Sequence, residues 1–198
     1  MKKIVFILSL MALLVTGCQN HNVIKVVMEN EEDTEVLIND YLDEICDGEV
    51  VDCKIRGRRV TLIYDCPIKE IWRGAFECKS LKNIEIPSSV TTIGDYAFSG
   101  CKSLKNIKIP SSVTKIGESA FSGCVSLKNI EIPSSVTKIG DCAFRGCESL
   151  KNIKIPSSVT KIGDYAFVDC ESLKKVRISR NTDLGYGVFP EDVEIIEY

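Results

Sequence analysis

One phrase of the sequence constrains its fold more than any other feature. The stretch LKNIEIPSSVT at 81–91 returns almost unchanged at 104–114, 127–137 and 150–160. Five cysteines mark the same interval, because they lie 23 residues apart: Cys78, Cys101, Cys124, Cys147 and Cys170. Strict self-similarity at a period of this length is typical of a solenoid, in which each repeat forms one coil that stacks on the next.

Each repeat supplies eight apolar positions that we expect to face the core. They are Leu81, Ile84, Ile86, Val90, Ile93, Ala97, Phe98 and Cys101 in the first full unit. Ile84 and Ile86 alternate with polar residues as in a strand, and Pro87 ends that strand because it cannot donate to a ladder. Asp95 is expected to begin and cap a short helical turn. Because ordering a residue costs ~1.5 kcal/mol and burying an apolar side chain contributes ~1.5–3 kcal/mol, one unit alone would not fold.

The consensus L-K-N-I-E-I-P-S-S-V-T-x-I-G-x-x-A-F-x-x-C resembles the BspA-type leucine-rich repeat of bacterial surface proteins, over residues 68–189. The resemblance implies a leucine-rich repeat solenoid that is right-handed, β-rich α/β in class, and lined on its concave face by a parallel sheet. It also implies a role in surface attachment, to host proteins or to other bacteria.

The first residues have the composition of an export signal. An apolar run at 4–15 follows two lysines, and it is shorter than the ~20 residues of a membrane span but as long as a signal-peptide core. The run leads into LVTGC at 14–18, which resembles the bacterial lipobox. That resemblance implies removal of 1–17 and attachment of lipid to Cys18, which would anchor the chain stably in a membrane. The alternative is an ordinary secretory signal with an incidental cysteine.

The residues outside the repeats differ from them in charge. Between 19 and 52 there are eleven acidic residues and one lysine, a net charge of −10, whereas 53–198 has a net charge of +5. We expect 18–33 to be a flexible acidic tether. We expect 34–67 to be an N-terminal cap, with a helix at 36–45 and a hairpin around Arg56-Gly57-Arg58, because the first coil of a solenoid needs covering. The segment 190–198 is expected to add a closing strand, so that both ends are capped.

Two polar columns of the repeat bear on function. The column at Glu85 alternates in sign and continues as Lys108, Glu131, Lys154 and Arg177. Opposite charges on neighbouring strands stabilise the strand register, so this column is predicted to have a structural role. The other column is a row of like charges that is identical in every unit: Lys82, Lys105, Lys128, Lys151 and Lys174. It is either a basic stripe for an anionic partner, such as an acidic glycan or an acidic protein patch, or a solvated row that keeps the sheet soluble. An asparagine row beside it is expected to bond along the stack: Asn83, Asn106, Asn129 and Asn152.

Tyr96 and Tyr165 share a variable column with Ser119 and Cys142. Exposed tyrosines suit protein or sugar contacts, and they are equally what a drifting surface position produces, so both interpretations stay open. Cys142 is expected to face solvent.

The cysteines fall into two groups, those of the repeats and those outside the repeats. The five repeat cysteines are expected to be small buried side chains with inert thiols. Outside the repeats, an exported protein can form disulfides, and Cys46 with Cys53 is the candidate pair. No metal site is predicted, because the sequence has no C-x-x-C pair and His21 is isolated.

No enzyme signature occurs in the sequence: it has no nucleophile elbow, phosphate loop or histidine-based site, and we expect neither catalysis nor a cofactor. The net charge of −3 gives no reason to expect nucleic acid. Three hypotheses remain: a surface lipoprotein that binds a macromolecule for adhesion or attachment, an envelope structural or assembly protein that binds another bacterial protein, and a glycan-binding module that uses the lysine stripe. The expected location is the bacterial cell envelope, lipid-anchored at the outer membrane or cell surface, and the expected partner is a protein or glycan, with a host extracellular molecule among the candidates.

Overall fold

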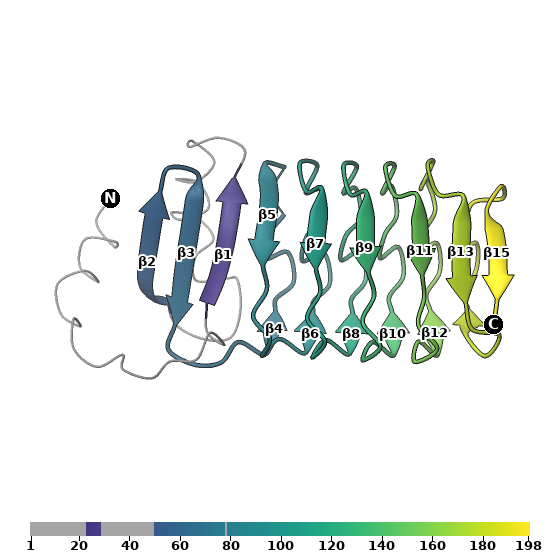
Figure 1. Ribbon diagram of the computed structural model, residues 1–198, viewed down its shortest axis with the longest axis horizontal. Coiled ribbons are helices and arrows are strands. Elements are labelled where there is room, and N and C mark those ends of the chain that lie inside the picture. The colour runs from purple at the N-terminus through teal and green to yellow at the C-terminus, as the bar shows by residue number, and fades with distance from the viewer. Residues whose placement is uncertain (1–22, 29–49, 78) are drawn as a thin grey trace.

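The structure is a computed structural model that describes residues 23–28, 50–77 and 79–198, with the backbone alone at 50–53 and 55. The repeats form a solenoid whose coils stack along one axis, as Figure 1 shows. Each full coil contributes one strand to a long sheet and a two-residue strand to a second, shorter-stranded sheet. The solenoid predicted from the 23-residue period is therefore confirmed.

The long sheet carries the repeated LKNIEIP phrase. Its strands in the repeats are β5 (Leu81–Glu85), β7 (Asn106–Lys108), β9 (Asn129–Glu131), β11 (Asn152–Lys154) and β13 (Lys175–Ile178). β5 pairs with β7, β7 with β9 and β11 with β13, all in parallel and shifted by one repeat. These pairings form a six-stranded sheet that ends at β9 and a three-stranded sheet that begins at β11. Because β11 lies next to β9 in the same row of strands (Figure 1), we call the whole row the long sheet.

The second sheet runs along the other side of the coils. Its strands are β4 (Glu70–Ile71), β6 (Thr92–Ile93), β8 (Lys115–Ile116), β10 (Lys138–Ile139), β12 (Lys161–Ile162) and β14 (Asp183–Leu184). All pair in parallel with their neighbours in repeat order. The isoleucines of adjacent strands lie opposite one another, so each strand pairs with the equivalent residues of the next repeat.

The N-terminal end of the long sheet corrects one expectation. β1 (Val23–Met28) pairs antiparallel with β5 on one side and with β3 (Arg59–Tyr64) on the other. The expectation that 18–33 is a flexible tether is therefore wrong at 23–28. Ile24, Val26 and Met28 are buried on one side of the strand, an alternation that the acidic composition of the surrounding sequence obscured. The remaining tether residues lie outside the described part.

The hairpin expected around Arg56-Gly57-Arg58 is present. β2 (Val50–Arg56) pairs antiparallel with β3, and Gly57 adopts a positive φ of 56° in the connecting turn. The helix expected at 36–45 lies outside the described residues. At the opposite end of the chain, β15 (Glu194–Glu197) pairs in parallel with β13. The Tyr198 hydroxyl donates a hydrogen bond of 2.7 Å to the carbonyl oxygen of Ile155, which ties this last strand to the coils before it.

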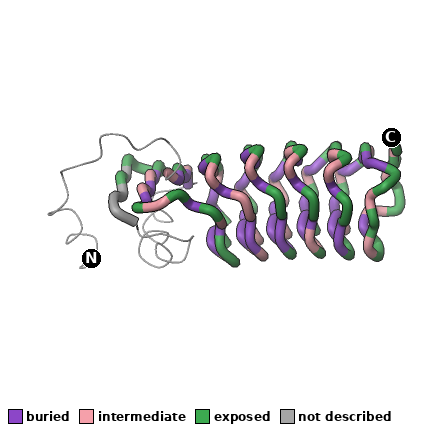
Figure 2. Tube along the Cα trace, turned by 90° about the horizontal axis from the view of Figure 1, so that it is seen from below, coloured by how far each residue is buried: buried purple, intermediate pink, exposed green. Residues whose placement is uncertain are grey.

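The core runs through the middle of the coils along their whole length (Figure 2). All eight predicted positions are buried in the second unit: Leu104, Ile107, Ile109, Val113, Ile116, Ala120, Phe121 and Cys124. The phenylalanines stack from coil to coil, with ring centroids 5.2 Å apart for Phe98 and Phe121 and 5.3 Å apart for Phe121 and Phe144. Because such offset pairs add to the free energy gained by burial, the stack is a continuous axis of the core.

The helical turn expected after Asp95 is not formed, and the described residues contain strands and turns without a helix. The α/β class is therefore corrected to a β-solenoid in the described part. Asp95 does accept a backbone hydrogen bond, but from Glu118 in the next coil, at 2.9 Å. Asp141 accepts one from Asp164 in the same way, at 3.0 Å. The carboxylate thus joins two coils instead of capping a helix.

Adjacent coils approach most closely at the glycine that follows each short-strand isoleucine. A Cβ atom placed on Gly140 would lie 2.6 Å from the backbone nitrogen of Glu118 and 2.6 Å from the carbonyl carbon of Gly117. Trp72 occupies the equivalent position in the first coil, where β4 is the edge strand of its sheet. A large side chain fits there because no earlier short-sheet strand stands against it.

No helix within the described ranges is both long and apolar enough to span a bilayer.

Candidate functional site

The outward side of the long sheet is a polar surface that repeats from coil to coil. Two rows form it, and we call them together the polar face: the asparagine row (Asn83, Asn106, Asn129, Asn152) and the charged row (Glu85, Lys108, Glu131, Lys154). All eight side chains are exposed. Each row repeats at the strand spacing of ~4.8 Å, because the parallel register places equal letters side by side. The face therefore presents the same groups again and again along one line.

Two neighbouring hollows lie on the polar face. Each has a volume of about 670 Å³; the first lies over β5 and β7, and the second over β7 and β9. Asn106, Lys108 and Ser111 line both hollows, so the two adjoin. Amide, hydroxyl and charged groups from successive coils line them together with the edges of the strand isoleucines. An extended molecule lying along the solenoid axis would meet hydrogen-bonding groups in every coil.

The charged row is longer than the sequence predicts. Lys25 of β1 lies opposite Glu85 of β5, and its Nζ is 2.7 Å from Glu85 Oε2. Lys108 follows on the next strand and Glu131 after it. The alternation therefore begins in β1, which sequence reasoning assigned to a tether. Because both partners of the Lys25–Glu85 pair are more than half exposed, it contributes at most ~1 kcal/mol and serves mainly to favour one register.

The asparagine row does not form the expected ladder. Within the described residues, its four side chains make no hydrogen bond to one another or to the backbone. Their amides point to solvent from an exposed position, so each keeps its donors and its acceptor. The bonding along the stack that the sequence predicts is therefore absent, and the row is available to a ligand.

The lysine row lies beside the hollows and does not line them. Lys105, Lys128, Lys151 and Lys174 are exposed, and Lys82 is half-buried. Backbone bonds hold the row in register: the Lys128 amide donates to the Lys105 carbonyl oxygen at 3.1 Å, and the Lys174 amide to that of Lys151 at 3.0 Å. The structure thus places the predicted stripe at the start of the long-sheet strands, along one margin of the polar face.

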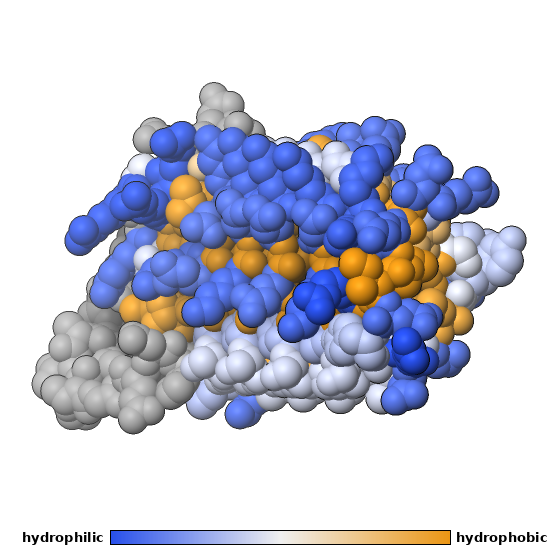
Figure 3. All heavy atoms as spheres, turned by 45° about the vertical axis from the view of Figure 1, so that its right-hand side comes forward, coloured by the Kyte–Doolittle hydropathy of each residue, from blue (hydrophilic) through white to orange (hydrophobic). Residues whose placement is uncertain are grey.

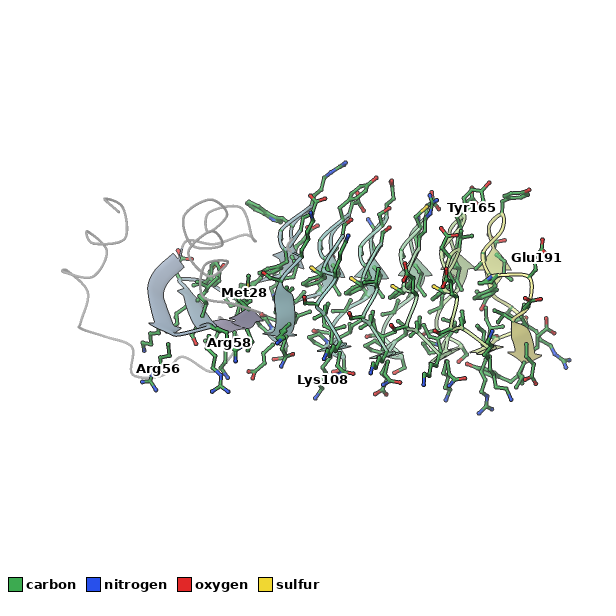
Figure 4. The ribbon with its side chains drawn as sticks, turned by 90° about the horizontal axis from the view of Figure 1, so that it is seen from above. Met28, Arg56, Arg58, Lys108, Tyr165 and Glu191 are labelled. Atoms are coloured by element: carbon green, nitrogen blue, oxygen red, sulfur yellow. The ribbon has the colours of Figure 1, made fainter. Side chains whose placement is uncertain are left out.

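The tyrosine column lies away from the polar face. Figure 4 shows Tyr165 and Lys108 on opposite sides of the solenoid. Tyr96, Ser119, Cys142 and Tyr165 all have φ between 51° and 57°, a left-handed conformation that costs a side-chain-bearing residue ~1–2 kcal/mol. Glycine fills this column at both ends, as Gly74 and Gly187. The conformation therefore belongs to the turn of every coil.

Tyr96 and Tyr165 are held by different neighbours. The Tyr96 hydroxyl donates a 2.6 Å hydrogen bond to Glu118 Oε1, and the guanidinium of Arg73 lies 4.9 Å from the ring centroid. The hydrogen bond and the negative charge of Glu118 raise the pKa of the Tyr96 phenol. Tyr165 packs edge to face against Tyr186, at 5.4 Å between centroids. Cys142 between them is half-buried, so the expectation of a solvent-facing thiol is met in part.

The repeat cysteines are structural in the described residues. Cys101, Cys124, Cys147 and Cys170 are buried and free of disulfides. The Cys124 thiol donates to the carbonyl oxygen of Phe98 at 3.1 Å, and the Cys147 thiol to that of Phe121 at 3.3 Å. Burial raises the pKa of Cys170 from 9.0 to about 12 and raises that of Cys147 well above its ordinary value. The Cys147 and Cys170 thiols therefore stay protonated and unreactive at neutral pH.

Other predicted sites fall beyond the described part. Cys18, Cys46 and Cys78 lie outside it, and only the backbone is described at Cys53. The lipid attachment and the Cys46–Cys53 pair are thus not tested. Among the described side chains, no group of three or more His, Cys, Asp or Glu residues is placed to hold a metal ion.

Sequence reasoning also missed a second row of lysines. Lys115, Lys138 and Lys161 lie opposite one another on the second sheet and are exposed. Their signal was present as the recurring letters T-K-I-G at 114–117, 137–140 and 160–163. It was missed because only one strand per coil was expected there, whereas the structure pairs a second one.

The exposed hydrophobic side chains gather at the C-terminal end. Leu184 is 43% exposed, Tyr186 72% and Ile195 47%, and hydrophobic atoms are visible toward this end in Figure 3. β14 and β15 are the last strands of their sheets. The apolar residues there follow from the end of the repeat, because no further coil covers them.

Comparison with known proteins agrees with this architecture. The model of the BspA type Leucine rich repeat region matches residues 69–195 in six copies. A leucine rich cell surface protein from Faecalibacterium prausnitzii is similar in structure, with a TM-score of 0.55 and 44% identity over 57% of this chain and 30% of the other. The leucine rich repeat protein of T. pallidum gives a TM-score of 0.56 and 36% identity over 66% of this chain and 68% of the other.

A pneumococcal vaccine antigen, PcpA, shares the fold alone, at 23% identity and a TM-score of 0.52 over 59% of this chain and 31% of the antigen. The chain thus matches under a third of the length of the F. prausnitzii protein. No curated protein matches it. The repeat period, the stacked coils and the six matched copies together show that the chain belongs to the BspA-type leucine-rich repeat family.

Proposed function

We propose that this chain is a bacterial cell-surface lipoprotein whose leucine-rich repeats bind a macromolecule in adhesion or attachment. The observation that carries the proposal is the polar face, where identical coils present exposed amides and charges in line. The side-chain amides of Asn106 and Asn129 are exposed and make no hydrogen bond to another described residue, so their exposure is not explained by a structural role. A side chain that stabilises nothing in the fold is available to a partner.

The shape of the site favours a large ligand. The adjoining hollows extend over three strands, and the lysine row continues along one margin of the polar face. Repeated weak contacts give useful affinity only when one ligand engages several coils at once. The F. prausnitzii relative is described as a cell surface protein, which supports a surface location for this chain. The partner is a protein or a glycan, and a host extracellular molecule fits the adhesive role.

The test is capture of partners by the full-length chain from host extracellular matrix and from bacterial envelope fractions. The variant Asn106→Ala with Asn129→Ala should lose the captured partner, because it removes amides from both hollows and leaves the buried residues unchanged. Ser122→Ala with Ser99→Ala serves as the control, because Ser122 lies in the coil of Asn106 and Ser99 in the coil before it, both in turns outside the hollows. Capture that is equal with all three proteins would contradict binding at the polar face. A bacterial envelope protein as the captured partner would favour the alternative role in envelope assembly.

Anchoring and processing belong to the same proposal. The lipobox-like LVTGC at 14–18 supports export, cleavage after Gly17 and lipid on Cys18, which places the chain on the outer membrane or cell surface. Mass spectrometry of the mature N-terminus tests this, and Cys18→Ala should release the chain from membranes. The candidate Cys46–Cys53 disulfide is tested by peptide mapping without reductant.

We further propose that the solenoid is right-handed, with the long sheet on its concave face and both ends capped. The pairing of β1 with β5 and of β15 with β13 supports the capping, because edge strands left open invite association; the handedness and the concave face rest on the resemblance to the family. A crystal structure of the full-length chain would decide the handedness. The chain is proposed to be a binding scaffold without catalysis, so partner capture and not turnover is the relevant assay.

A further inference from the structure

The lysine row is not uniform along the solenoid. Each lysine ends a four-residue segment at the start of a coil, which we call a strand-start segment: KSLK at 79–82, KSLK at 102–105, VSLK at 125–128, ESLK at 148–151 and ESLK at 171–174. Counting +1 for lysine and −1 for glutamate, their net charges are +2, +2, +1, 0 and 0. The positive charge therefore gathers in the first three coils, although the lysine row itself continues through all five.

The structure brings the charged segments together. The Ser103 amide donates to the Lys79 carbonyl oxygen at 3.0 Å, and the Lys128 amide to the Lys105 carbonyl oxygen at 3.1 Å. The leucine in each segment is buried, which turns the flanking lysines outward. Neighbouring coils place these lysines ~4.8 Å apart. Figure 3 shows hydrophilic side chains along the upper edge of the solenoid, where the long-sheet strands begin.

Four of these five charges are not neutralised inside the described fold. Lys79, Lys102, Lys105 and Lys128 are exposed and make no ion pair with any residue that the structure describes. At the other end of the row, each lysine has a glutamate in the same segment, Glu148 for Lys151 and Glu171 for Lys174. Because the field of a surface decays within a Debye length of about 8 Å at physiological salt, those glutamates cancel much of the local potential.

We propose that the strand-start segments at 79–82, 102–105 and 125–128 form a binding surface for a linear polyanionic polysaccharide. This rests on the proposed function, whose macromolecular ligand it narrows to one chemical class. The positive groups repeat at coil spacing in two columns, which suits a polymer with an anionic group on each repeat. The uncompensated charges of Lys79, Lys102, Lys105 and Lys128 also attract such a polymer at long range.

A protein partner fits this surface less well. The exposed residues of the three segments are lysines, whereas Ser80 is buried and Ser103, Ser126 and Val125 are half-buried. Protein interfaces instead depend on aromatic and arginine anchors set in pockets, and these segments contain neither. The exposed tyrosines lie in another column of the coil. An acidic protein is therefore an outcome of the test and not the proposal.

The experiment measures binding of heparin, used as the sulfated probe, to the full-length chain at low and at about 0.15 M salt. The intact chain should bind heparin, with affinity falling as salt rises, and should not bind neutral dextran. Lys102→Ala with Lys105→Ala should weaken heparin binding about tenfold. Lys151→Ala with Lys174→Ala removes the same number of charges from the neutral segments and should have a clearly smaller effect. Lys138→Ala with Lys161→Ala on the second sheet is the matched control for charge removal alone.

A variant that gains positive charge tests the same dependence of heparin binding on segment charge, even if the lysine variants fold poorly. Glu148→Gln with Glu171→Gln changes those two segments from 0 to +1 each and should strengthen heparin binding several-fold. Equal losses in the two lysine variants of the row, or an unchanged affinity in the glutamine variant, would overturn the charge gradient. Tighter binding of poly-L-glutamate than of heparin would overturn the choice of a polysaccharide. If the chain captures its surface partner but does not bind heparin, this inference fails while the proposed function stands.

Discussion

Stacking of the coils depends most sharply on the glycine after each short-strand isoleucine, and Gly140→Ala tests this dependence. The new Cβ atom would lie 2.6 Å from Glu118 N, 2.6 Å from Gly117 C and 2.7 Å from Gly117 O. All three are backbone atoms, so no side chain can move aside and the coils themselves must separate. Overpacking of this kind costs ~1–3 kcal/mol.

Separation of the coils also weakens the bonds between them. The Gly140 amide donates to the Ile116 carbonyl oxygen at 2.9 Å, and the Thr137 amide to that of Thr114 at 2.9 Å. At ~0.5–1.5 kcal/mol each, they bring the expected loss to about 2–6 kcal/mol, a large share of the ~5–15 kcal/mol that stabilises a typical domain. The midpoint of thermal unfolding should fall on the order of 10 °C.

Gly146→Ala is the matched control in the same coil. Its φ is +69°, but the nearest atoms to a new Cβ are 3.7 Å away, on Gly123. The expected cost is therefore the backbone strain alone, ~1–2 kcal/mol. Both variants are compared by urea denaturation and by calorimetry. A loss at Gly140 no greater than the loss at Gly146 would refute the argument from close approach of the coils.

Three further predictions follow from the core and the turns. Phe121→Ala removes a ring stacked between Phe98 and Phe144 and should cost ~3–5 kcal/mol in denaturant unfolding; a cost below ~1 kcal/mol would mean that the stack does not hold the core. Cys142→Gly relieves a φ of 53° and should raise stability by about 1 kcal/mol, so a lowered unfolding midpoint would argue against strain in that turn. Burial raises the pKa of Cys170 from 9.0 to about 12, so the unfolded state loses its thiol proton at a lower pH than the folded state does. The contribution of this group to the free energy of unfolding should therefore decrease as the pH rises from 9 to about 12. A Cys170→Ala variant should lack that part of the pH dependence.

The periodic part of the molecule was predictable because every coil repeats the same pattern of apolar and turn residues. The buried set from Leu104 to Cys124 follows from alternation and spacing, and the structure confirms all eight positions. The turn at Asp95 was not predictable in the same way. Its carboxylate meets the amide of Glu118 only when the next coil is in place, and a sequence window does not contain that neighbour.

The ends of the solenoid and the candidate site were harder to predict for related reasons. β1 was hidden because VIKVVM lies in a strongly acidic segment, and its burial depends on pairing with β5, far along the chain. The sequence pattern placed the asparagine and lysine columns on one sheet. Whether an asparagine amide forms a hydrogen bond within the fold depends on its distance from other polar atoms, which the sequence does not give. The hollows exist because adjacent strands leave space between their outward side chains, which no single repeat reveals.

The central claim is that the outward side of the long sheet binds the ligand, and a lysine-labelling footprint tests it most directly. Acetylation of the full-length chain with and without its captured partner, followed by mass spectrometry, compares lysines that are exposed on both sheets. We expect protection of Lys105, Lys108 and Lys128, whereas Lys115, Lys138 and Lys161 on the second sheet should stay reactive. Protection of the second-sheet lysines, with the long-sheet lysines unchanged, would contradict it.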